Sequence, residues 1–310
     1  MRHPTGEQYE IVLDTSAGVL RAVVTEVAAG LRELSLAGVD IAVPFPVDAA
    51  PPGASGIALA PWPNRVRDAR WSAVSPDGVR YDEALAVTEP DKANALHGLL
   101  RYTPYALVEQ GMASVALAAT IFPQTGWPFT LDTSVSYALV DDGLVVEHSA
   151  TNVGAASAPV AFGAHPYLGI GDVPTETLSL AVAAQTHFNV DARLDPVAEV
   201  PVEGTRFDLR SPRLVGDLVL DDGFGSAGPG VLAALSAPDG RSVELWGDEA
   251  TTYLQVFTHR RHPPLPEGAV ALALEPMTAP ADALNSGTGL RWLAPGESWS
   301  ARWGIRLAGF

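Results

Sequence analysis

The sequence predicts a mostly β protein built as one large antiparallel β-sandwich. Period-two alternation of apolar and polar residues recurs along the chain, turn signals separate the alternating runs, and long helical periodicity is scarce. Glycine and proline occur 29 and 26 times among 310 residues and are spread along the chain, as expected for many short strands joined by turns. No internal repeat or change in composition marks a linker, so we expect a single domain over residues 1–310.

The strands are expected to pair as hairpins. The clearest hairpin joins the alternating residues 131–139 to an extended run over residues 144–148 through Asp142-Gly143. Proline, aspartate and glycine in succession mark two further hairpin turns, at residues 76–78 and 238–240. Apolar residues between 34 and 41 indicate one more strand near the start, and residues 281–284 are a short helix candidate.

Charge and cysteine content exclude several classes of protein. The formal net charge is −17, and an acidic surface repels nucleic acid and anionic membranes, so we expect neither as a partner. The chain has no cysteine, which removes disulfides, thiolate nucleophiles and cysteine-based metal sites. Lys92 is its single lysine and lies in a polar stretch, which disfavours Schiff-base and phosphate-loop chemistry. No signal-peptide pattern or membrane-length apolar run occurs, so a cytoplasmic protein is expected.

The familiar cofactor and metal motifs are missing from the sequence. No GxGxxG fingerprint follows a strand, and no GxSxG nucleophile elbow occurs. His259 and His262 form the one close histidine pair, and the two arginines between them would repel a cation. We expect an exposed, charged loop there, whose imidazoles do not converge on a metal. The sequence therefore predicts no cofactor and no metal site.

Four segments place polar side chains beside residues that fix the backbone. Residues 61–65, Pro-Trp-Pro-Asn-Arg, form a rigid platform next to an amide and a guanidinium. This platform could hydrogen-bond sugar hydroxyls while Trp62 packs on the ring, or it could be a surface turn with a packing tryptophan. His97 is followed by Gly98, which lets a ligand or another strand approach closely, although a satisfied structural histidine would look the same.

His165 and Glu275 belong to the other two segments. Glycine and proline flank His165, and Pro166 biases it to an extended conformation that would hold the imidazole at a fixed angle. Residues 271–274 form an apolar strand that ends in Glu275, where Pro276 is expected to stop the ladder of hydrogen bonds. A carboxylate at the end of a buried strand is costly unless it is paired or functional. Glu275 is therefore either a site residue or part of a structural salt bridge.

Together these segments resemble the aldose 1-epimerase family, also called galactose mutarotases. The resemblance covers residues 10–308 and rests on short motifs in the family's order: Asn64-Arg65, Leu96-His97-Gly98, His165-Pro166-Tyr167, the segment 220–224 with Asp221, Glu275-Pro276, and a tail over 279–285.

This resemblance implies both a fold and a set of residue roles. The fold would be a large antiparallel β-sandwich of the galactose mutarotase type. Glu275 matches the family's general base, His165 matches its general acid, and His97 matches a second histidine near the ring oxygen. The residues that match the family's sugar-binding positions are Asn64, Arg65, Asp221 and Tyr167.

Four positions, in three segments, depart from the family pattern. Leu99 stands where a second glycine is frequent after His-Gly, Leu168-Gly169 replaces Phe-Asn, and Asp222 replaces a common histidine. These departures resemble a bacterial subgroup. They keep the proposed acid and base, and they leave the choice between galactose and glucose open.

Mutarotation needs two proton movements. A base removes the proton of the anomeric hydroxyl, and an acid protonates the ring oxygen as the C1–O5 bond breaks. The open aldehyde rotates about C1–C2, and the reverse steps close the other anomer. A carboxylate and an imidazole suit these tasks because both can be tuned toward neutral pH. The sequence therefore predicts a cofactor-free aldose 1-epimerase that acts on a small sugar.

Three alternatives stay open at this level. A hexose-6-phosphate 1-epimerase could use Arg65, Arg67 and Arg70 for phosphate, although on a strand Arg70 would point away from the other two. A non-catalytic carbohydrate-binding module or sensor would need tryptophan, arginine and aspartate contacts, but neither Glu275 nor both histidines. A purely structural sandwich would show a peptide groove or an interaction tail, and the sequence marks neither.

Overall fold

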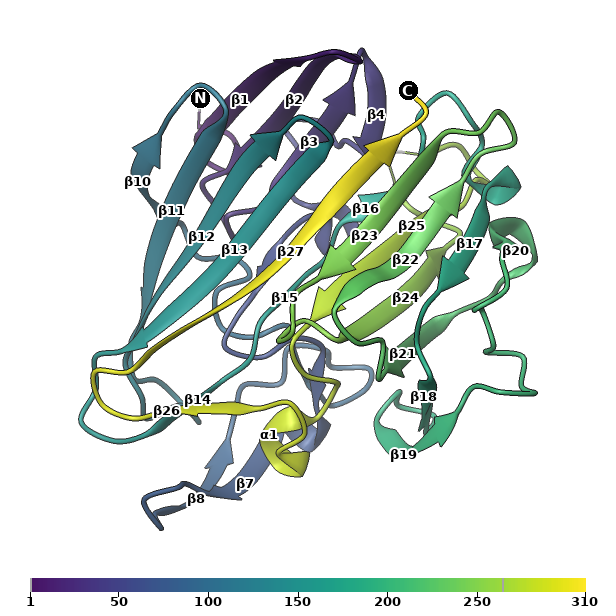
Figure 1. Ribbon diagram of the computed structural model, residues 1–310. Coiled ribbons are helices and arrows are strands. Elements are labelled where there is room, and N and C mark those ends of the chain that lie inside the picture. Colours follow the sequence, from purple (N-terminus) through teal and green to yellow (C-terminus); the bar gives the residue numbers. More distant parts are fainter. Residues whose placement is uncertain (1, 264) are drawn as a thin grey trace.

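The protein is a two-layer β-sandwich in the computed structural model, which describes residues 2–263 and 265–310 (Figure 1). Every pairing between strands in these residues is antiparallel, in a twelve-stranded sheet, a nine-stranded sheet and three small two-stranded sheets. The predicted mostly β class and the antiparallel sandwich are confirmed.

The larger sheet contains the chain's first strands and most of the strands near the site. Its members are β1 (Gln8–Thr15), β2 (Gly18–Thr25), β3 (Leu31–Leu36), β4 (Val39–Ala42), β5 (Ala58–Leu59), β15 (Gly163–Ala164), β16 (Tyr167–Leu168), β18 (Thr186–Val190), β19 (Pro196–Pro201), β21 (Asp221–Gly225), β24 (Tyr253–His259) and β25 (Ala271–Met277). They lie in the order β1-β2-β3-β4-β16-β25-β24-β21-β18-β19, and β15 pairs with both β25 and β5.

The smaller sheet forms the second layer. Its members are β10 (Ala106–Gln110), β11 (Ser114–Ile121), β12 (Leu131–Val140), β13 (Gly143–Asn152), β17 (Ser179–Val182), β20 (Arg213–Leu214), β22 (Gly230–Ser236), β23 (Ser242–Gly247) and β27 (Ser298–Ala308). They lie in the order β10-β11-β12-β13-β27-β23-β22-β17-β20, so the last strand of the chain pairs at the middle of this sheet (Figure 1).

Short elements close one end of the sandwich, at the bottom of Figure 1. These are the pairs β6 (Arg65–Val66) with β9 (Ala95–Leu96), β7 (Arg70–Val74) with β8 (Arg80–Ala84), and β14 (Ala158–Val160) with β26 (Arg291–Leu293), together with the helix α1 (Ala283–Ser286). Four 3-10 turns lie in the described chain: η1 (Pro52–Ala54), η2 (Arg67–Ala69), η3 (Thr175–Thr177) and η4 (Val215–Asp217).

The predicted hairpins are confirmed as β7–β8, β12–β13 and β22–β23. The single strand expected between residues 34 and 41 is wrong. Ala37 and Gly38 adopt φ values of 51° and 83°, and this left-handed turn divides the segment into β3 and β4. The short helix is confirmed at α1, which begins after Asp282 at Ala283.

The expectation that Pro276 stops its ladder is also wrong, because β25 continues to Met277. Pro276 pairs with Leu254 of β24. On the other side of β25, β16 pairs at Ala273 and β15 pairs at Met277. Pro276, which has no N–H to donate, lies between these two pairings and pairs with neither strand.

Apolar side chains of the two large sheets fill the space between them. The main cluster of buried residues draws on both sheets, from Ile11 of β1 to Ile305 of β27. Along β25, Leu272 and Leu274 belong to this cluster. Because successive residues of a strand point to opposite faces, Glu275 projects to the face of the larger sheet that is turned away from this core.

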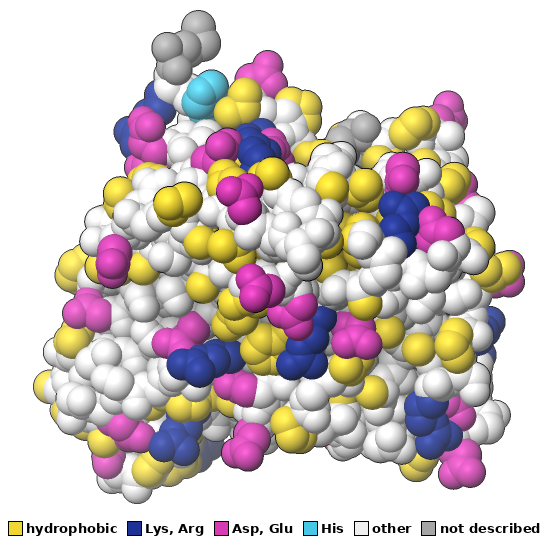
Figure 2. Space-filling view, turned by 45° about the horizontal axis from the view of Figure 1, so that its top comes forward, with side chains coloured by type: hydrophobic (Ala, Val, Ile, Leu, Met, Phe, Trp, Pro, Cys, Tyr) yellow, Lys and Arg dark blue, Asp and Glu magenta, His cyan; other side chains and the backbone are white. Residues whose placement is uncertain are grey.

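The described surface carries many more acidic than basic groups, as the net charge requires. Figure 2 shows aspartate and glutamate spread over one face, with fewer basic side chains among them. No helix in the described part of the chain is long and apolar enough to cross a membrane.

Candidate active site

Neighbouring strands of the larger sheet bring Glu275, Gln255 and Asp221 to one face. Gln255 of β24 lies directly opposite Glu275 of β25, and Gly223 of β21 lies directly opposite Gln255. Directly opposite residues in antiparallel strands project to the same face, and so do residues two apart in one strand, which adds Asp221. The pairing register therefore builds a polar patch across β21, β24 and β25.

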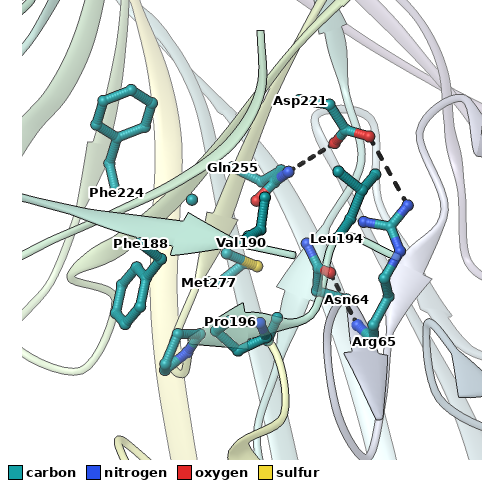
Figure 3. A pocket seen from close by; sticks show the side chains of 13 residues that line it. Asn64, Arg65, Phe188, Val190, Leu194, Pro196, Asp221, Phe224, Gln255 and Met277 are labelled. Atoms are coloured by element: carbon teal, nitrogen blue, oxygen red, sulfur yellow. Dashed lines mark hydrogen bonds and ion pairs between the residues drawn. The ribbon is translucent and has the colours of Figure 1, made fainter. Parts of the chain in front are cut away.

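Asp221 is the centre of an ordered polar network. The Gln255 side-chain amide donates to Asp221 Oδ1 at 2.7 Å, and Nη2 of Arg65 lies 3.8 Å from Asp221 Oδ2. Figure 3 shows both side chains pointing toward this carboxylate. Arg65 also binds Glu89 through both oxygens, at 2.8 and 2.9 Å. This bidentate pair fixes the buried guanidinium and offsets its charge, so its remaining N–H groups can be aimed at a ligand.

Asp222, a departure from the family pattern, supports Asp221 from behind. Its Oδ1 lies 2.9 Å from Nε2 of His187, and its Oδ2 accepts the backbone N–H of Asp221 at 3.1 Å. His187 is itself buried and stacks on Phe207, with ring centroids 3.5 Å apart. The carboxylate at position 222 thus holds the backbone of a predicted sugar-binding residue.

His97 reaches the site from an unusual backbone conformation. Its φ is 62°, and its N–H donates at 2.8 Å to the carbonyl of Asn64, whose φ is 54°. Gly98 follows with a φ of 71°, and a Cβ there would lie 2.1 Å from the carbonyl oxygen of Ala60. The expectation that Gly98 permits the close approach of another segment is confirmed.

His165 lies between β15 and β16 and meets Glu275 directly. Backbone hydrogen bonds hold it on both sides: its N–H donates to Ile57 at 3.1 Å, and its carbonyl accepts from Gly56 at 2.8 Å. Its Nε2 lies 3.3 Å from Glu275 Oε1, and its ring meets the His97 ring edge-on at 5.2 Å. The structure therefore brings together the three predicted catalytic side chains.

A cavity of about 350 Å³ opens onto these side chains. Its volume is within the range of about 300–1,000 Å³ that is typical of small-molecule sites. Glu275, His165 and His97 are only 3%, 5% and 7% exposed in it. The predicted site residues that line it are Asn64, Arg65, His97, His165, Asp221 and Glu275. The rest of its wall comes from Pro51, Gly53, Ala54, Ile57, Leu96, Arg101, Tyr102 and Phe257.

Burial shifts the pKa values of these groups toward their neutral forms. Burial raises the pKa of Glu275 well above its usual range, and the negative charge of Asp221 adds to this while Arg65 opposes it. Burial lowers the pKa of His165 to about 4 and holds the pKa of His97 well below its usual value. Between the lowered pKa of His165 and the raised pKa of Glu275, these two side chains therefore hold one proton between them.

The same three side chains have a spacing that could suit a metal ion. One ligand atom each from His97, His165 and Glu275 lie within 4.8 Å of one another. Arg101 lines the same cavity, and its positive charge opposes a bound cation. The charge environment therefore fits proton transfer on a small organic ligand better than metal binding.

Two aromatic residues singled out in the sequence do not line the cavity. Tyr167 is buried outside the lining, with its ring 5.3 Å from that of His165 and its hydroxyl donating to Gly53 at 3.2 Å. Trp62 is buried in the core, with its ring 5.8 Å from that of Trp127. Trp62 therefore forms neither the expected sugar platform nor a surface turn, because the aromatic core takes up its indole.

Sequence reasoning missed Glu89, Gln255 and Arg101. Glu89 lies outside every motif, and the pairing of β24 with β25 alone places Gln255 beside Glu275. Arg101 lines the cavity four residues after His97, and this nearness to a matched motif was the one available signal.

The clustered arginines 65, 67 and 70 do not form a common anion site. Arg65 binds Glu89, whereas Arg67 donates to the carbonyl of Pro196 at 2.6 Å. Arg70 is exposed, 3.3 Å from Asp82. The turn of η2 separates the three side chains, so the phosphate site considered as an alternative is not formed by them.

The expectation of an exposed loop at residues 259–262 holds for Arg260 and Arg261 and is wrong for His262. His262 is 2% exposed, and its Nδ1 lies 3.3 Å from Nδ1 of His259 at the end of β24. Arg260 donates instead to the carbonyl oxygens of Gly216 and Leu218. The chain turns sharply after β24, which brings the two rings together and carries this arginine away from them.

Comparisons with known proteins agree with this fold and identify a family. The chain matches the family model described as Aldose 1-epimerase over residues 10–306. It is 29% identical over 284 residues to "Uncharacterized protein YihR" of Escherichia coli (strain K12), covering 91% of this chain and 88% of that one. It is 30% identical over 152 residues to galactose mutarotase of Homo sapiens, covering 47% of this chain and 43% of that one.

Solved structures share the fold at lower sequence identity. A GalM/aldose epimerase homologue from C. elegans has a TM-score of 0.80 at 18% identity, covering 97% of this chain and 99% of that one. Galactose 1-epimerase from Lactobacillus acidophilus NCFM has a TM-score of 0.78 at 19% identity, covering 99% and 96%. The chain belongs to the aldose 1-epimerase family, and its fold is the β-sandwich of the galactose mutarotase type.

Proposed function

We propose that this protein is a mutarotase that interconverts the α and β anomers of an aldose. The observation that carries the proposal is the 3.3 Å contact between Glu275 and His165 in a cavity that also holds Arg65 and Asp221. Family membership supports an epimerase of this type. A binding module would need the polar contacts but not a buried carboxyl-imidazole pair.

The shared proton explains how this pair could work in both directions. Transfer of that proton along the contact leaves Glu275 as a carboxylate base and His165 as an imidazolium acid. Glu275 then takes the proton from the anomeric hydroxyl while His165 gives its proton to O5, and the C1–O5 bond breaks. After rotation about C1–C2, the same two groups return the protons as the ring closes. No proton is gained or lost over the cycle.

The remaining polar groups suit recognition of sugar hydroxyls. Arg65 offers guanidinium donors, Asp221 offers carboxylate acceptors, and Asn64 and His97 complete the wall of the cavity. Because burial keeps His97 neutral, its ring can donate or accept a hydrogen bond near the ring oxygen without adding a charge.

Polarimetry of freshly dissolved α-anomers tests the proposal. We expect the protein to accelerate the approach to anomeric equilibrium for at least one aldose in a panel of hexoses and pentoses, at a rate proportional to enzyme concentration. Binding of a sugar without acceleration would instead identify a carbohydrate-binding module, and would refute the catalytic role of the pair.

One observation favours a second candidate, an aldose with an anionic group such as a hexose 6-phosphate. Arg101 lines the cavity and packs on Tyr102 at 4.9 Å, and it makes no ion pair within residues 2–263 and 265–310. If His97 and His165 face O5, the exocyclic C6 lies beside them, because C5 carries both atoms. A substituent on C6 could then reach this guanidinium.

A matched pair of variants separates the two substrates. Arg101→Gln should lower kcat/KM for a hexose 6-phosphate by about tenfold and leave kcat/KM for the free hexose unchanged. Tenfold corresponds to the loss of one charge-assisted contact of about 1.4 kcal/mol. Arg80→Gln, on the exposed hairpin strand β8, serves as the control. Equal rates of wild type and Arg101→Gln on the phosphate would exclude this candidate.

A further inference from the structure

The loop over residues 51–57 forms one wall of the cavity and is joined directly to His165. Its residues at the cavity surface are Pro51, Gly53, Ala54 and Ile57. The backbone bonds from His165 to Ile57 and from Gly56 to His165 attach the end of this loop to the proposed acid. Any displacement of the loop would therefore move both the cavity wall and the imidazole.

A chain of side-chain hydrogen bonds fixes this loop from behind, and its directions can be assigned. Ser55 Oγ donates its one proton to the carbonyl of Pro52 at 2.7 Å. It lies 3.4 Å from Nε2 of His262, and in that contact the hydroxyl can only be the acceptor. Nε2 of His262 therefore carries its proton. In neutral His262, Nδ1 is then an acceptor, and Nδ1 of His259 is the donor that faces it at 3.3 Å.

Tyr167 connects the same cluster to the proposed acid. Its hydroxyl donates to the carbonyl of Gly53 in the loop, at 3.2 Å, and lies 3.4 Å from Nδ1 of His259. The His262 ring packs on the Tyr167 ring at 4.3 Å, and the His165 ring packs on it at 5.3 Å. His262 thus contacts both supports of the site, Ser55 in the loop and the tyrosine beside the imidazole.

We infer that His262 is a positioning residue for the reaction, acting through Ser55 on the loop and through Tyr167 on His165. The inference rests on the proposed function. It requires a side chain at 262 that donates at one end and accepts at the other. The neutral imidazole meets this need, and so does the amide of glutamine. Leucine has neither group, so the His259 N–H would lose its acceptor at Nδ1 and the Ser55 oxygen would lose its donor at Nε2.

The test compares His262→Leu with His262→Gln. A misplacement of about 1 Å at a reacting group can lower the rate as much as 10²-fold, so we expect His262→Leu to lower kcat by at least about tenfold, with a smaller change in KM. We expect His262→Gln to return kcat to within about threefold of wild type, because the amide restores both hydrogen bonds. A purely structural role would lower the melting temperature of both variants and leave kcat of the folded protein unchanged.

His148 provides the matched control. It is equally buried, at 2% exposed, and burial lowers its pKa to about 4. It lies on β13 of the other sheet, however, and accepts from Trp303 at 3.0 Å. His148→Gln should leave kcat unchanged. If His262→Leu does not fold, Ser55→Ala breaks the same chain at its next member and should lower kcat in the same direction.

The outcomes separate this inference from the proposed function. An active wild type whose folded His262→Leu or Ser55→Ala variant keeps the wild-type kcat would overturn the positioning role alone. Equal losses in His262→Leu and His262→Gln would also overturn it, because the hydrogen-bond pattern would then be irrelevant. A wild type without mutarotase activity would overturn the proposed function, and the positioning role with it.

Discussion

Replacement of Glu275 by glutamine should abolish most activity and at the same time raise stability. Glutamine keeps the size of the side chain and an oxygen to face Nε2 of His165, which lies 3.3 Å from the carboxylate, but it cannot take up a proton. A positioned general base contributes about 10²–10⁴-fold to the rate. We therefore expect kcat to fall by this factor, which equals an increase of about 3–5 kcal/mol in the activation barrier.

The effect on stability has the opposite sign because of burial. Burial raises the pKa of Glu275 in the folded state, so the folded protein binds this proton more tightly than the unfolded chain. Stability from this group is therefore complete below the unfolded pKa of about 4.3 and is lost as the pH rises toward the folded pKa. Between these two pKa values, the free energy of unfolding of Glu275→Gln should rise relative to that of wild type by about 1.4 kcal/mol per pH unit. The unfolding entropy is about 2.1 cal/mol/K per residue, so for 310 residues each kcal/mol of added stability should raise the melting temperature by about 1.5 °C.

Polarimetry of a freshly dissolved anomer measures the loss of activity, and thermal unfolding followed by circular dichroism at about pH 5 and about pH 8 measures the stability. Glu203→Gln is the control, because Glu203 is exposed on a turn and should change neither quantity. A Glu275→Gln variant that retains the wild-type rate would refute the role of the carboxylate. A variant less stable than wild type at both pH values would refute the claim that burial acts against its charge.

Two further predictions follow from the same structure. The rate should be constant with pH while Glu275 and His165 hold one proton between them. It should fall as the pH drops toward about 4, where His165 becomes protonated, and fall again at high pH where Glu275 ionises. A pH–rate profile that does not fall near the His165 pKa would contradict the proposed roles. Gly98→Ala should lower the free energy of unfolding by about 2–5 kcal/mol in chemical denaturation, because its Cβ would overlap Ala60 at a positive φ. Gly78→Ala is the control: Gly78 also has a positive φ, 80°, but open space around it, so the substitution should cost about 1–2 kcal/mol. Equal costs would show that the close approach to Ala60 does not matter.

Local patterns predicted the strands and turns well, and failed where partners distant in the sequence decide the outcome. The β12–β13 hairpin was readable because alternation and an Asp-Gly turn are properties of neighbouring residues. The sequence could not predict that β25 continues through Pro276, because this depends on which strands pair with β25 on each side. Trp62 was placed wrongly for a similar reason, since its environment is made by Trp127 from another part of the chain.

By itself, the sequence determined the strand-rich class, the absence of cysteine chemistry and the short motifs that carry the proposed acid, the proposed base and the arginine. Only the tertiary structure decided that Gln255 stands beside Glu275, that Glu89 holds Arg65, and that His262 is buried behind Tyr167. The physical reason is range: backbone preferences and hydrophobic alternation act between near neighbours in the chain, whereas the distance between two polar groups on different strands is set by pairing register and by the packing of loops over the sheet.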